Sequence, residues 1–180
     1  MTAVGGHMRA RWRGAGVLTF VSLLGLALTA ACARESEAAL RDRLDHWFAI
    51  GDTVAFEARG DCLAAVFRLT SADVKAPMPV MSDPMGMLLQ IKRAGRAALD
   101  SSRQSPDAGL VDLANAERAT GMAMRRAALE GRACMDPVAE SAFRAAIEGP
   151  RSVLAYDREN GAVMMMDPVT GLLVVAMGAP

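Results

Sequence analysis

Residues 152–177 read SVLAYDRENGAVMMMDPVTGLLVVAM and contain three short apolar runs separated by turn residues. Asn160-Gly161 suits the positive φ of a tight hairpin, and residues 167–171 supply a second turn with proline and glycine. The last run is apolar at consecutive positions, which is typical of a strand covered on both faces. The stretch therefore predicts a three-stranded antiparallel meander with strands at 152–156, 162–166 and 172–177.

Three helices are predicted before this meander, because three capping side chains are each followed directly by proline. The pairs are Asp83-Pro84, Ser105-Pro106 and Asp136-Pro137. A side chain that caps the first turn and a proline in that turn together mark a helix start. The apolar spacing that follows predicts helices at 84–100, 106–131 and 137–148.

The N-terminal half of the domain predicts one more helix and a hairpin. Leu40, Leu44, Trp47 and Phe48 recur at helical spacing, and this helix is expected to end near Gly51. Residues 53–59 and 62–69 predict a hairpin, although 53–59 also continue the helical period and could be helix. Residues 70–83 carry two prolines and predict a loop.

This order of elements predicts an α+β domain. We expect an antiparallel sheet of four or five strands, made of the N-terminal hairpin and the C-terminal meander, with three or four helices covering one face. The order resembles that of PAS and Cache-type sensor domains, in which the last strand joins the first in the middle of the sheet. The resemblance implies the fold only, because function depends on particular residues.

The N-terminal residues predict export from the cytoplasm. Three arginines at 9, 11 and 13 precede an apolar stretch at 17–31, which is the charge-then-apolar order of a secretory signal. The stretch ends Leu-Thr-Ala-Ala-Cys at 28–32 and resembles the lipobox of bacterial lipoproteins, which implies lipid attachment at Cys32. Residues 1–31 would then be the signal peptide, 32–36 a tether and 37–180 a single domain.

Two other interpretations of this leader stay open. Ala31-Cys32-Ala33 also fits ordinary A-x-A cleavage, which would release a soluble periplasmic protein. Residues 14–33 are also just long enough to remain as an uncleaved membrane anchor. With lipidation we expect a location in the cell envelope facing the periplasm, and the residue after Cys32 favours the outer membrane.

The remaining cysteines agree with an oxidising compartment. Apart from Cys32 the chain has only Cys62 and Cys134, and paired thiols are typical of exported proteins. We expect one disulfide between them, with two buried free thiols as the alternative.

Composition and motifs exclude several function classes. The 20 basic residues balance 20 acidic residues, so the chain lacks the charge of a nucleic-acid-binding protein. Signature motifs for zinc, redox, hydrolase, phosphate and dinucleotide sites are absent from the sequence. Beyond the leader His46 is the only histidine, so any catalytic triad or multi-histidine site depends on it. We expect a non-enzymatic domain without a cofactor, and an enzyme of unrecognised type using carboxylates and His46 is an alternative.

Methionine suggests a further alternative. Four of the 13 methionines gather around the proline-containing loop, at Met78, Met81, Met85 and Met87. Thioether sulfur is a soft ligand that favours Cu(I), so these residues form a candidate copper site, although filling of irregular core gaps is the simpler explanation. The leading expectation is an envelope lipoprotein that binds an envelope protein or a small ligand in a groove between helices and sheet.

Overall fold

The computed structural model describes residue 2 and residues 35–178. The described elements form an α+β domain, which confirms the predicted class. In chain order they are α2 (Glu37–Asp45), β1 (Phe48–Arg59), β2 (Cys62–Val74), β3 (Val80–Met81), α3 (Pro84–Ala94), β4 (Arg96–Leu99), α4 (Pro106–Ala116), α5 (Arg118–Gly131), the 3-10 helix η1 (Arg132–Cys134), α6 (Pro137–Glu148), β5 (Val153–Asp157), β6 (Ala162–Asp167) and β7 (Leu172–Met177).

The sheet has seven strands in the order β1-β2-β7-β6-β5-β4-β3. Neighbouring strands are antiparallel except β3 and β4, which are parallel. The C-terminal meander is confirmed, with Leu154 opposite Met165 and Met165 opposite Val174. Its two turns end at Gly161 and Gly171, whose φ values of 58° and 67° require glycine-like freedom.

The strand order differs from the sensor-domain resemblance. The last strand, β7, pairs with the second strand, β2, and β1 lies outside β2 at the edge. The sheet also has more strands than the four or five expected, because two short strands, β3 and β4, extend the opposite edge. The PAS-like pairing of first and last strands is therefore wrong for this domain.

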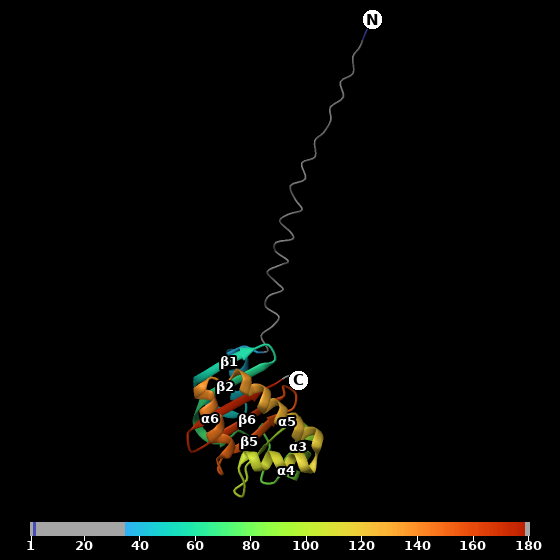
Figure 1. The fold of residues 1–180 in the computed structure, drawn as a ribbon, viewed down its shortest axis with the longest axis vertical. Coiled ribbons are helices and arrows are strands. Elements are labelled where there is room, and N and C mark those ends of the chain that lie inside the picture. Colours follow the sequence, from blue (N-terminus) through green and yellow to red (C-terminus); the bar gives the residue numbers. More distant parts are fainter. Residues whose placement is uncertain (1, 3–34, 179–180) are drawn as a thin grey trace. The chain divides into compact units, whose positions relative to one another are not determined.

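Apolar residues of the sheet alternate between two cores, one on each face, because successive side chains of a strand point to opposite sides. Figure 1 shows the helices α3, α4, α5 and α6 on one side of the sheet, and their apolar residues pack in the first core. The other face is covered by α2, Trp47 and Met78, which pack in the second core. Helices therefore cover both faces, not one as predicted. The first core takes Leu154, Tyr156, Val163, Met165 and Val174 from the sheet, and the second takes Ala155, Met164, Met166, Leu173 and Val175.

Two of the predicted helix ends are wrong. The first helix, α2, ends at Asp45 rather than near Gly51, because Phe48 already pairs with Val74 in the sheet. The open question about residues 53–59 is settled as strand, since they pair with β2. The helix predicted to reach residue 100 ends at Ala94, where Gly95 adopts a left-handed φ of 75° and β4 follows.

The predicted helix at 106–131 is two helices. Glu117 is extended, with φ −148°, and its carboxylate accepts a hydrogen bond from the N–H of Thr120 at 3.2 Å, which starts α5. Gly121 then lets the two helices pack tightly, since a Cβ there would lie 2.3 Å from the Cα of Ala114. The loop predicted at 70–83 is also shorter, because β2 continues to Val74 and β3 occupies Val80–Met81.

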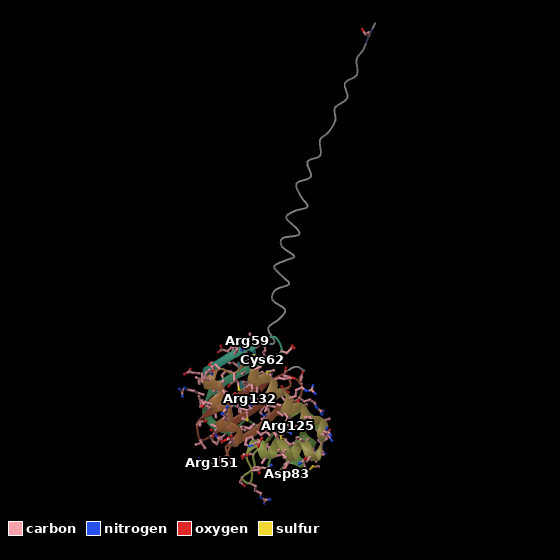
Figure 2. All side chains as sticks on the ribbon, viewed as in Figure 1. Arg59, Cys62, Asp83, Arg125, Arg132 and Arg151 are labelled. Carbon is pink, nitrogen blue, oxygen red and sulfur yellow. A yellow bond between two sulfur atoms is a disulfide. The ribbon has the colours of Figure 1, made fainter. Side chains whose placement is uncertain are left out.

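The disulfide predicted between Cys62 and Cys134 is present, with the two Cα atoms 5.8 Å apart. Figure 2 shows Cys62 beside Arg59, its pairing partner across the turn between β1 and β2. The bond therefore ties the tip of the N-terminal hairpin to η1, which directly follows α5.

Candidate functional site

The four loop methionines do not form one set of ligands. Met78 is buried in the second core and Met87 in the first, so the sheet separates them. Met81 packs against the first core, whereas Met85 is 56% exposed. Packing in two different cores accounts for Met78, Met81 and Met87, and no observation in the described structure favours a shared copper site.

His46 is an exposed residue at the end of α2, where its backbone N–H bonds back to the last turn. Among the hydrogen bonds of residues 35–178, none joins its imidazole to a carboxylate. The same residues contain no group of three or more histidine, cysteine or acidic side chains placed to hold a metal ion. His46 therefore gains no catalytic partner from the fold.

Cys32 and the predicted signal peptide lie outside the described residues. The end of the predicted tether is described, and Ser36 caps α2 by accepting a hydrogen bond from the N–H of Ala39 at 3.2 Å. None of the helices in the described part has the length and apolarity needed to cross a bilayer.

A pocket of about 280 Å³ lies between α5 and the turn that joins β5 to β6, and we call it the α5 pocket. Three alanines at spacing i, i+4 and i+8 line its helical wall, from the exposed Ala119 through Ala123 to the buried Ala127. Their small side chains leave the space that larger residues would fill. The other lining residues are Thr120, Arg126, Tyr156, Arg158 and Gly161.

Tyr156 is the most informative residue of the α5 pocket. Only 4% of its surface is exposed, and its ring packs in the first core. Burial raises the pKa of its hydroxyl above the ordinary value, Arg158 opposes this rise, and Asp157 adds to it. Within residues 35–178 the hydroxyl has no hydrogen-bond partner, and it is not among the side-chain atoms buried from solvent without one, which are Gln104 Nε2 and Ser152 Oγ. The hydroxyl is therefore open to solvent. The missing partner leaves a hydrogen-bond donor available to an occupant of the pocket.

Two arginines bring positive charge to the α5 pocket. Arg158 donates to the Thr120 hydroxyl at 3.4 Å, which leaves most of its N–H groups uncommitted. Arg126 is exposed on α5 and has no ion-pair partner among the described residues. No acidic side chain lines the pocket.

The turn that carries Arg158 is held by the buried carboxylate of Asp157, which is only 1% exposed. One of its oxygens accepts from Arg43 at 3.1 Å and from the Asn160 amide at 2.6 Å. The other oxygen accepts from the N–H of Glu159 at 3.2 Å, and the N–H of Arg158 bonds to the carbonyl of Gly95 at 2.8 Å. These contacts fix the backbone of the turn, so the pocket wall is organised before any ligand binds.

Comparison with known proteins identified no relative. No protein family, curated protein or solved structure matches the chain. Its function is therefore inferred from the chain's own sequence and geometry.

Three further pockets of the described residues can be compared with the α5 pocket. One of about 130 Å³ lies beside the disulfide, a shallow one borders η1 and α6, and one of about 210 Å³ lies among α4, α5 and α6. Each has both basic and acidic residues in its lining, for example Arg59 with Glu57 beside the disulfide and Arg125 with Asp107 among the helices. Their charges are partly balanced, which separates them from the α5 pocket.

The sequence did not predict the polar residues of this pocket. Tyr156 and Arg158 stand at the end of a predicted strand, and Arg126 lies 30 residues before Tyr156 on another element. The sequence signal that does exist is a small-residue face on the helix, which includes Ala123 and Ala127 and indicates close packing as readily as a pocket. The fold itself is needed to bring the three together.

Proposed function

We propose that this protein is an exported, lipid-anchored domain of the cell envelope that binds a small ligand in the α5 pocket. The arginine-led apolar leader and the lipobox-like residues at 28–32 support export and attachment through Cys32. The disulfide between Cys62 and Cys134 supports an oxidising compartment, because such bonds are rare in the cytosol. The protein would then face the periplasm, and the outer membrane is the favoured membrane.

The single observation that carries the binding function is Tyr156. The residue is only 4% exposed and lines a pocket of about 280 Å³, and its hydroxyl has no partner among the described residues. The hydroxyl is not among the side-chain atoms that are buried from solvent without a partner. It is therefore free to donate a hydrogen bond to a ligand that displaces solvent from the pocket.

Binding is favoured over catalysis by the chemistry of the lining. The polar groups of the pocket are the Tyr156 and Thr120 hydroxyls and two guanidinium groups, which mainly donate hydrogen bonds. The lining has no histidine, carboxylate or free thiol that could act as a general base or nucleophile near neutral pH. Such a site can hold and orient a ligand without transforming it.

The binding function is tested by a thermal-shift screen with small carboxylates, phosphate esters, amines, amides and sugars. The variant Ala123→Leu fills the pocket from the helix, and Ala145→Leu is its control because Ala145 is exposed on α6 outside the pocket. At a ligand concentration 100 times Kd, binding stabilises by about 2.7 kcal/mol. We expect at least one chemical class to raise the Tm of the wild type and Ala145→Leu but not of Ala123→Leu; a screen in which no class does so contradicts the proposal.

The location is tested separately by the intact mass of the protein purified from its native envelope. We expect a chain that starts at Cys32, carries acyl groups and has lost two hydrogens at Cys62 and Cys134. A full-length chain without acyl groups in the cytosolic fraction would contradict export and anchoring.

A further inference from the structure

We propose that the ligand of the α5 pocket is a small organic anion whose carboxylate or phosphate group is bound by Arg126, Arg158 and the Tyr156 hydroxyl. This inference rests on the proposed binding function and specifies its ligand class. Both head groups present several acceptor oxygens to the same donors, so they form one class for this site.

The first argument is charge. The α5 pocket has two basic side chains and no acidic one in its lining, whereas each of the other three pockets contains both signs. Burying an anion requires a compensating cation, and a pocket lined by cations alone would lose affinity for a cationic ligand. The charge pattern therefore selects against amines and in favour of anions.

The second argument is the set of donors. A guanidinium presents planar N–H groups that match the oxygens of a carboxylate or phosphate. Arg126 has no partner within the described residues, and Arg158 uses one nitrogen on the Thr120 hydroxyl. The Tyr156 hydroxyl, which has no partner among the described residues, adds a third donor. The three groups come from α5 and from the β5–β6 hairpin, so they reach a ligand from two sides.

Two carboxylates interact electrostatically with residues of the pocket, and both are outside its lining: Asp157 acts on Tyr156, and Glu117 interacts with Arg158. The Glu117 carboxylate accepts a hydrogen bond from the N–H of Thr120, and its pKa is lowered by that residue's hydrogen bonds and by Lys92 and Arg158. Arg126 is not among the groups that act on Glu117. Asp157 is already paired with Arg43 on the other face of the sheet.

The third argument is the apolar part of the lining. Ala119, Ala123 and Ala127 present methyl groups along α5, and Gly161 presents backbone only. These residues offer no side-chain hydrogen bonds, so the part of the ligand that lies against them is compact and apolar. The volume of about 280 Å³ lies just below the range of drug-sized ligands, so the ligand is small.

The test uses the fact that the chain has a single tyrosine. Protein labelled with ¹³C at the tyrosine ζ carbon gives one resonance, which reports on a residue that lines the pocket. The probes are butyrate, propyl phosphate and butyramide, titrated at pH 7 and constant ionic strength; butyramide matches butyrate in shape but is uncharged. We expect butyrate or propyl phosphate to shift the resonance in a saturable way. Butyramide is expected to bind at least tenfold more weakly. The anion that binds more tightly identifies whether the head group is a carboxylate or a phosphate.

The arginines are tested with Arg126→Gln and Arg158→Gln, and each is expected to weaken anion binding tenfold or more. The control is Arg125→Gln, because Arg125 neighbours Arg126 on α5 but lines the pocket among α4, α5 and α6. Figure 2 labels Arg125 on the helical side of the domain. The affinity of this variant for the anions is expected to stay within twofold of the wild type.

Two outcomes overturn the inference. Equal binding of butyramide and butyrate would show that charge does not select the ligand, while the proposed binding function would stand. The absence of a shift with both anions up to 50 mM would also refute it, and the neutral arms of the thermal-shift screen would then decide whether the pocket binds anything.

Discussion

Removal of the disulfide is the sharpest test of how the domain is held together. Cys62 and Cys134 are 72 residues apart, so the bond closes a loop of about 73 residues. In the chain-entropy model such a loop restricts the unfolded chain by about 4.4 kcal/mol. For a domain of this size that corresponds to a fall in Tm of about 10–20 °C.

The structure explains why so much depends on one bond. The closed loop contains α3, β4, α4 and α5, which supply most of the helical layer, and both ends of the loop meet at η1. Without the bond, the tip of the β1–β2 hairpin is attached to η1 by non-covalent contacts such as the Arg59 hydrogen bond to the Ala133 carbonyl at 3.2 Å. This guanidinium is exposed, so that contact contributes little.

The assay is urea unfolding of the oxidised wild type, the reduced wild type and the double variant Cys62→Ala/Cys134→Ala. We expect the last two to lose about 3–5 kcal/mol, to agree with each other within about 1 kcal/mol, and to show a larger m value because their unfolded chains expand further. If the oxidised and reduced proteins unfold within about 0.5 kcal/mol of each other, the bond does not stabilise the fold and the reasoning is wrong.

Three further predictions concern packing, a turn and pH. The substitution Gly121→Ala places a Cβ against the Cα of Ala114 and should lower the free energy of unfolding, measured in urea, by about 1–3 kcal/mol. An unchanged free energy of unfolding would contradict the tight packing of α4 on α5. The substitution Asp157→Asn leaves Arg43 facing a neutral amide and should lower the free energy of unfolding by about 2–3 kcal/mol. The control is Asp167→Asn, because the Asp167 carboxylate holds a similar turn without a cation, and it should cost about 1 kcal/mol. Equal losses would refute the role of the ion pair. Because burial raises the pKa of Tyr156, the absorbance of its phenolate should appear above pH 10 in the folded protein and at about pH 10 in urea. The stability that the protonated hydroxyl of Tyr156 contributes should be complete below pH 10 and should be lost as the pH rises through the pKa of the folded protein. Identical phenolate titrations in the folded and the urea-unfolded protein would contradict the burial of Tyr156.

The sequence predicted those elements whose boundaries are encoded locally. Asp83, Ser105 and Asp136 each accept a hydrogen bond from the N–H three residues later, as the capping pairs indicated. The C-terminal meander was predictable for the same reason, because Gly161 and Gly171 sit where a positive φ is required. These signals need no knowledge of distant contacts.

The missed features depend on tertiary pairing. Ala98 continues the apolar stripe of α3, but its N–H bonds to the carbonyl of Pro79 at 2.8 Å and places it in a strand. Phe48 fits the period of α2, yet its pairing with Val74 and burial in the second core make it the start of β1. In both cases sheet formation overrides a helical pattern that is locally satisfactory.

The candidate site could not be predicted from the sequence for a related reason. Spacing can place residues on one face of an element, and the alanines of α5 are such a case. A pocket, however, needs the relative position of two elements, here α5 and the β5–β6 hairpin, which is set by the packing of Met124 and Ala127 on the first core. The sequence anticipated a groove between helices and sheet, but not which groove.

The helix α2 and the α5 pocket lie on opposite faces of the sheet. The helix α2 packs on the second core, whereas Tyr156 and Ala127 of the α5 pocket belong to the first core. A ligand in the pocket therefore contacts α5 and the β5–β6 hairpin without touching α2. Two arginines and the Tyr156 hydroxyl are the groups that it meets there, and together they are suited to an anion.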